Sequence, residues 1–133
     1  MPAFTPEIDN KLKSLVQSFK LQFDFAVAAD MNDPQDILEF ALRNHTTANT
    51  MIDVMKAMGL TLQPGQSDAD LLNKIADIAA ENGSSTEDDL RSIAKKVHAV
   101  NEGVQKLAQE KLQSGQKPNG TDMNRVFKKF LSK

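Results

Sequence analysis

Residues 87–113 read EDDLRSIAKKVHAVNEGVQKLAQEKLQ. The large apolar residues of this stretch recur at spacings of three and four, the heptad pattern of a helix that buries one side along its length. They are Leu90, Ile93, Val97, Val100, Val104 and Leu107. At about 1.5 Å per residue, a helix over this range spans on the order of 40 Å. One long helix with a single apolar seam predicts a helical bundle.

The rest of the chain repeats the helical pattern. Thr5-Pro6 predicts the start of a first long helix that reaches about Asp30, and Asp33-Pro34 predicts the start of a second. Tyr and Trp are absent, and no stretch sustains the period-two alternation of a half-buried strand. We therefore expect an all-α fold, an antiparallel bundle of five or six helices in which the first helix and residues 87–113 are the two long antiparallel members.

Turn and capping residues divide the middle of the chain. Residues 44–50, NHTTANT, are poor helix formers, so the sequence leaves open whether residues 34–58 are one helix or two. Gly59 is expected to end this region in a left-handed conformation, and residues 60–66 form a loop. Ser67 and Asn82-Gly83 mark the two ends of the next helix, and Ser85-Thr86 is the expected cap of residues 87–113.

The end of the chain is expected to be a separate element. Residues 114–121, SGQKPNGT, read as a linker, because glycine and proline disfavour continuation of a helix. The predicted organisation is therefore a helical bundle over residues 1–113, the linker, and a short basic amphipathic helix over residues 122–133, capped by Thr121-Asp122 and packed on the same domain.

Composition excludes several kinds of protein. The chain has no cysteine, which removes disulfides, thiolate zinc sites and thiol nucleophiles. No stretch approaches the roughly 18 consecutive apolar residues that a membrane span requires, so we expect no membrane span and a cytoplasmic protein.

Charge is unevenly distributed along the chain. Residues 1–90 contain 6 Lys or Arg against 15 Asp or Glu, a net charge of −9, and residues 91–133 contain 10 against 3, a net charge of +7. The two blocks are expected to face each other within the bundle, with an anionic partner for the basic block as the alternative.

Catalytic and metal-binding patterns are not found. His45 and His98 are the only histidines, and His98 with Glu102 supplies two ligands where a metal site needs at least three. The acidic run from Asp30 to Glu39 lacks the glycine of a calcium loop, and helix capping explains it. A DNA-reading helix-turn-helix over residues 71–97 would carry the acidic residues 87–89 into the groove. We expect no enzyme, no cofactor and no metal.

Apolar helix faces remain as the candidate functional feature. The predicted partner-binding residues lie on two amphipathic segments, and they are Met51, Met55, Met58, Val126, Phe127 and Phe130. They predict an interaction protein that binds another polypeptide or itself, such as an adaptor, a chaperone-like binder or a regulatory subunit. The alternative is a nucleic-acid-associated protein with a basic patch of Arg91, Lys95, Lys96, Arg125, Lys128 and Lys129.

Overall fold

The computed structural model describes residues 4–132, and within that range the chain forms five helices and no strand. The helices are α1 (Pro6–Ala28), α2 (Pro34–Met58), α3 (Asp68–Glu81), α4 (Glu87–Gln113) and α5 (Gly120–Leu131). The predicted all-α class is confirmed, and α4 covers the range expected from its apolar seam.

Local capping explains where three of the helices begin. The side chains of Thr5, Asp33 and Ser67 each accept a hydrogen bond from a backbone N–H in the first turn of the helix that follows. Ser67 also receives the reciprocal bond, because the carboxylate of Asp70 accepts its backbone N–H at 3.1 Å. These three predicted starts are confirmed.

α4 begins at the predicted residue but is not capped by a side chain as predicted. Thr86 is the N-cap, but its side chain caps no backbone N–H. The hydroxyl of Ser84 accepts the Thr86 N–H at 3.2 Å and donates to the carboxylate of Asp9, in the first turn of α1, at 2.5 Å. The start of α4 is therefore stabilised by a contact of the α3–α4 turn with α1.

α2 is one helix across the polar stretch. The hydroxyls of Thr46, Thr47 and Thr50 donate to backbone carbonyls four residues earlier, at 3.0–3.1 Å. Because these bonds satisfy the hydroxyls inside the helix, buried Thr47 can pack against α1 without an unpaired polar group. The helix ends at Gly59, which has the expected left-handed conformation with a φ of 68°.

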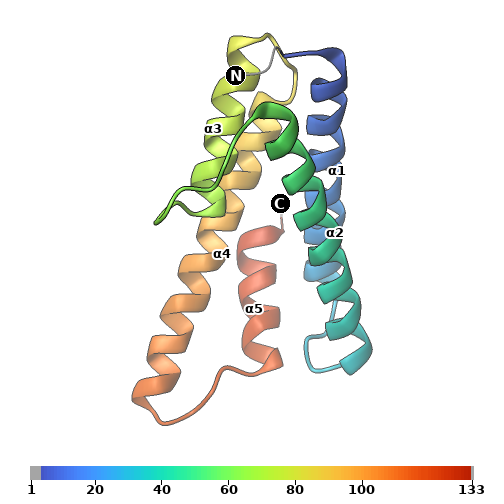
Figure 1. The fold of residues 1–133 in the computed structure, drawn as a ribbon. Helices are drawn as coiled ribbons and strands as arrows, with labels where there is room; N and C mark the ends of the chain where they lie inside the picture. Colours follow the sequence, from blue (N-terminus) through green and yellow to red (C-terminus); the bar gives the residue numbers. More distant parts are fainter. Residues whose placement is uncertain (1–3, 133) are drawn as a thin grey trace.

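The two long helices run in the same direction, so their predicted antiparallel arrangement is wrong. α1 pairs antiparallel with α2, and α3 with α4, but the 59–67 connection returns along the molecule so that α3 runs parallel to α2 (Figure 1). Contacts between α1 and α4 also show that these two helices are parallel. The turn before α4 meets Asp9 near the start of α1, and Nζ of Lys96, further along α4, lies 5.9 Å from the ring centroid of Phe23, further along α1.

The bundle is sealed at one end and open at the other. Its fully buried large side chains come from the start of α1, the end of α2, α3 and the start of α4. They are Leu12, Leu15, Val54, Met58, Leu71, Leu72, Ile75 and Leu90. α3 has 14 residues against 27 in α4, so it covers only the first half of α4 (Figure 1). Beyond it, α5 packs between α1 and α4.

α5 starts earlier than predicted. Its cap is Asn119, not Thr121-Asp122, because the Asn119 side chain accepts the Asp122 N–H at 3.0 Å and the Asp122 carboxylate accepts the Asn119 N–H at 3.1 Å. Gly120 is required at the first position, since an added Cβ would lie 2.3 Å from the carbonyl oxygen of Met31. The connection between α4 and α5 is therefore residues 114–119. Phe127 and Leu131 of α5 belong to the same apolar core as the other helices.

Candidate binding surfaces

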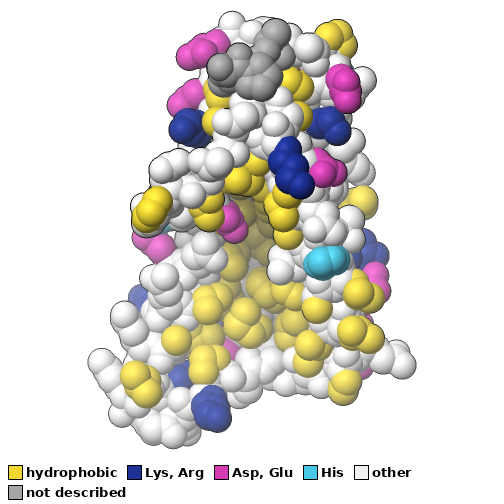
Figure 2. Space-filling model, viewed as in Figure 1, with side chains coloured by type: hydrophobic (Ala, Val, Ile, Leu, Met, Phe, Trp, Pro, Cys, Tyr) yellow, Lys and Arg dark blue, Asp and Glu magenta, His cyan; other side chains and the backbone are white. Residues whose placement is uncertain are grey.

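An apolar cleft occupies the open end of the bundle. It has a volume of about 290 Å³ and receives side chains from all five helices. Its lining residues are Phe19, Gln22, Phe23, Phe40, Asn44, Asp68, Val97, Val100, Asn101, Met123, Phe127 and Leu131. The space-filling view shows the face hollowed between α2 and α4, with apolar side chains gathered in its lower half (Figure 2). Inside the cleft, the ring centroids of Phe40 and Phe127 lie 5.2 Å apart, and this aromatic pair joins α2 to α5.

One buried polar group borders this cleft. Gln22 is only 8% exposed, and its Nε2 donates to Oδ1 of Asn44 at 3.0 Å. Its Oε1 is buried and accepts no hydrogen bond within residues 4–132. Such an atom lowers stability by about 1–3 kcal/mol unless a partner is supplied. The cleft therefore has aromatic walls and an unpaired amide oxygen buried beside it.

A second apolar surface lies outside the bundle, on the α1–α2 pair. Leu21, Leu38 and Leu42 are 48%, 61% and 54% exposed. Leu21 and Leu42 line one groove of about 380 Å³ between the two helices, and Leu38 lies one helical turn from Leu42. We call these three residues the leucine surface. Contiguous exposed apolar side chains are typical of an interaction site, whereas a single exposed leucine is common on any protein.

The charges beside the leucine surface are paired with each other. Nε of Arg43 lies 3.0 Å from the Glu39 carboxylate, and its guanidinium carbon lies 4.9 Å from the ring centroid of Phe25. The other side chains lining the groove are uncharged, and they are Ser18, Leu21, Gln22, Leu42, Thr46 and Thr47. Depletion of charge at the centre of an exposed patch is typical of protein interfaces.

The residues predicted to bind a partner lie mostly inside the molecule. Met51, Met58, Val126 and Phe127 are buried, and Met55 and Phe130 are half-buried. α5 is docked closely on α4, because a Cβ added to Gly103 would lie 2.7 Å from Cε2 of Phe130. The partner-binding role of these residues stays a prediction, and it would require α2 or α5 to separate from the bundle.

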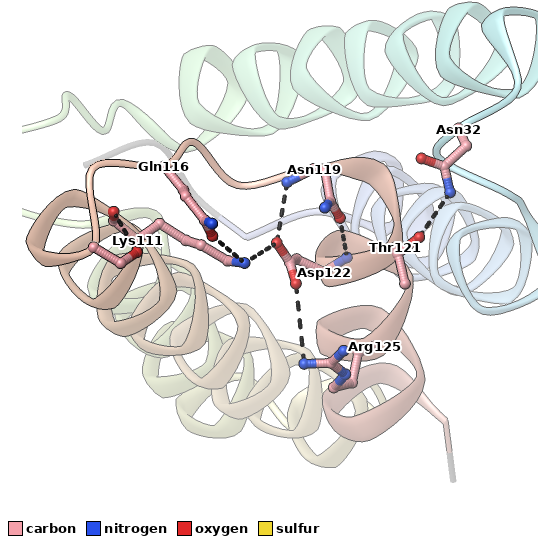
Figure 3. A network of polar contacts seen from close by, with 8 residues as sticks. Asn32, Lys111, Gln116, Asn119, Thr121, Asp122 and Arg125 are labelled. Atoms are coloured by element: carbon pink, nitrogen blue, oxygen red, sulfur yellow. Dashed lines mark hydrogen bonds and ion pairs between the residues drawn. The ribbon is translucent and has the colours of Figure 1, made fainter.

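A polar network holds the start of α5 (Figure 3). The carboxylate of Asp122 lies 3.5 Å from Nζ of Lys111 in α4 and 4.0 Å from the Arg125 guanidinium. The backbone N–H of Asn119 holds the pKa of Asp122 below its usual value, and the charge of Lys111 adds to this effect. A buried carboxylate thus fixes α5 to α4 at the end of the bundle where the linker enters.

The predicted basic residues are distributed over different parts of the structure. Arg91 lies 2.8 Å from the carboxylates of both Asp77 and Glu87. Lys96 is half-buried beside α1, while the side chains of Lys95, Arg125, Lys128 and Lys129 are exposed. The acidic first turn of α4 thus neutralises part of the basic block within the molecule. The nucleic-acid role stays a prediction.

One further ion pair lies on the surface of α4. His98 and Glu102 are exposed on α4 with Nε2 and Oε1 3.0 Å apart. No group of three or more His, Asp or Glu side chains in the described part of the chain could hold a metal ion. No helix within that part is both long and apolar enough to cross a membrane.

The fold and the two surfaces define an all-α bundle with an apolar cleft at its open end. Comparisons of the chain with protein-family models, curated proteins and solved structures find no match.

Sequence reasoning identified Phe127 of the cleft but overlooked its other lining residues and all three residues of the leucine surface. The available signal was in residues 37–42, ILEFAL, where five of six residues are apolar. A helix with one buried face cannot hide apolar side chains that point to all sides, so this segment indicates either a fully buried helix or an exposed binding surface. Gln22 carried no such signal, because nothing in the sequence distinguishes it from an exposed glutamine.

Proposed function

We propose that this protein is a non-enzymatic interaction module that binds another polypeptide, or a second copy of itself, through the leucine surface. The observation that supports the proposal is the adjacent exposure of Leu21, Leu38 and Leu42 on the outer side of α1 and α2. Covering three leucines of this exposure removes apolar area from water, the main favourable term in most protein association.

Neighbouring features suit a docking surface. The groove beside the leucines would receive the side chains of a partner, and the internal pairing of Glu39 with Arg43 leaves no unpaired charge there to be desolvated. The surface lies on two long helices that pack against each other, so its backbone is already folded before binding. Rigid surfaces lose little conformational entropy on association.

The test compares the wild-type chain with Leu38→Ser/Leu42→Ser. Solution mass is measured by light scattering over a concentration series, and proteins retained from a lysate are identified by mass spectrometry. We expect the double variant to lose self-association, or to lose the specific set of proteins that the wild type retains. Leu112→Ser is the matched control, because Leu112 is 79% exposed at the far end of α4. Identical mass and identical retained proteins for all three chains would refute the proposal.

A further inference from the structure

The cleft at the open end of the bundle has the size of a site for a small organic molecule. It lies between α2 and α4, where the space-filling view shows the face hollowed (Figure 2). Its volume is about 290 Å³. At ~30 Å³ per water molecule, this volume has room for roughly ten molecules of water. A ligand of about ten non-hydrogen atoms therefore fits the cleft.

Aromatic rings on the lining remain open to a positively charged group. Elsewhere in residues 4–132, a cation of the chain lies over a phenylalanine ring at 4.9–5.9 Å from the centroid, and these rings are Phe23, Phe25 and Phe130. Phe19, Phe40 and Phe127 line the cleft and have no such cation within the same residues. Phe19 and Phe40 are half-buried, so part of each ring is accessible. The faces of aromatic rings attract ammonium groups.

The charge on the lining is negative. Asp68, the first residue of α3, is the single charged residue among the lining residues, and no Lys or Arg is present. Its side chain is exposed, and none of the ion pairs in the described part of the chain uses its carboxylate. A full negative charge outweighs the roughly half charge of opposite sign at the start of a helix. The lining therefore favours a cationic head group over an anionic one.

From these observations we infer that the cleft binds a small organic cation, an ammonium group attached to an apolar body of about ten non-hydrogen atoms. The body covers the aromatic walls and the side chains of Val97 and Met123, which removes apolar area from water. The ammonium group pairs with the Asp68 carboxylate at the edge of the cleft. This inference goes beyond the leucine surface and does not rest on it.

The test uses three eight-carbon amphiphiles that differ in their head group, and they are octylammonium, 1-octanol and octanoate. Each is titrated at neutral pH into the nitrogen-15-labelled full chain, and affinity is taken from the shifts of the backbone amide signals of Val97, Asn101 and Met123. We expect octylammonium to bind most tightly and octanoate least. The ratio of octylammonium affinity to octanol affinity should fall about fivefold in Asp68→Asn, the upper range for one exposed ion pair.

Asp88→Asn is the matched control, because Asp88 is also an exposed acid in the first turn of a helix but lies at the sealed end of the bundle. It should leave the affinity ratio unchanged. Leu38→Ser/Leu42→Ser should also leave it unchanged, so loss of the leucine surface and loss of the cleft site are measured separately. In the wild type, added salt should reduce the preference for octylammonium, since salt screens exposed charges.

Three outcomes would overturn the inference. The first is an affinity ratio that is the same in the wild type and Asp68→Asn. The second is the absence of saturable shifts at Val97, Asn101 and Met123 up to the concentration at which octylammonium forms micelles. The third is tighter binding of octanoate than of octylammonium, because an anionic head group would then be the preferred one.

Discussion

Replacing Phe127 by alanine tests how firmly α5 is joined to the bundle. Phe127 is buried in the core, and its ring contacts that of Phe40 across the cleft. Burial of a phenylalanine side chain stabilises a fold by ~1.5–3 kcal/mol, and an aromatic pair adds ~0.5–1.5 kcal/mol. Truncation at fully enclosed sites costs ~3–5 kcal/mol. Because one side of Phe127 borders the cleft, where water can enter, we expect a loss of about 3 kcal/mol.

The assay is urea unfolding followed by circular dichroism at the helix band, since the chain has no Trp to report by fluorescence. With a denaturant slope of about 2 kcal/mol per molar urea, the midpoint should fall by roughly 1.5 M. Phe130→Ala is the matched control on the same helix, and its half-buried side chain predicts a smaller loss of about 1 kcal/mol.

Hydrogen exchange distinguishes local release of α5 from general destabilisation. A 12-residue helix is marginal by itself, so α5 should lose protection when its docking is weakened. The half-buried seam of α4 from Val97 to Leu107 should lose protection with it. A loss below about 1 kcal/mol in Phe127→Ala, or unchanged exchange in α4, would refute the view that α5 is an integral part of the core.

Two further predictions concern acid stability and the basic residues. The Ser84 hydroxyl holds the pKa of Asp9 below its ordinary value of 3.8, so this contact stabilises the folded chain above about pH 4 and the contribution is lost as the pH falls through the folded-state pKa. The difference in Tm between the wild type and Asp9→Asn should therefore be present at pH 6 and shrink below pH 3.8, and a constant difference would contradict this role. Because Arg91 is paired within the bundle, we expect short duplex and single-stranded probes to migrate unchanged at low salt. A salt-sensitive shift abolished by charge reversal in α5 would instead establish the nucleic-acid role, and the residues reversed are Arg125, Lys128 and Lys129.

The sequence by itself determined the helices, because their signals are local. Thr5, Asp33 and Ser67 cap helices through atoms within three residues, and Gly59 ends α2 through its own backbone. The apolar seam of α4 predicted its length for the same reason. The start of α5 was predicted two residues late although its cap is also local, since Asn119 and Asp122 cap each other and Gly120 packs against the carbonyl oxygen of Met31.

Only the tertiary structure decided the direction of the long helices and the location of the candidate surfaces. The 59–67 loop is long enough to place α3 either antiparallel or parallel to α2. The periodicity of the apolar residues is the same in both arrangements. The cleft exists because α3 is half the length of α4, which leaves aromatic side chains from separate helices around an uncovered space. Gln22 is buried beside that space, a property that depends on residues distant in the chain and is invisible in its own neighbours.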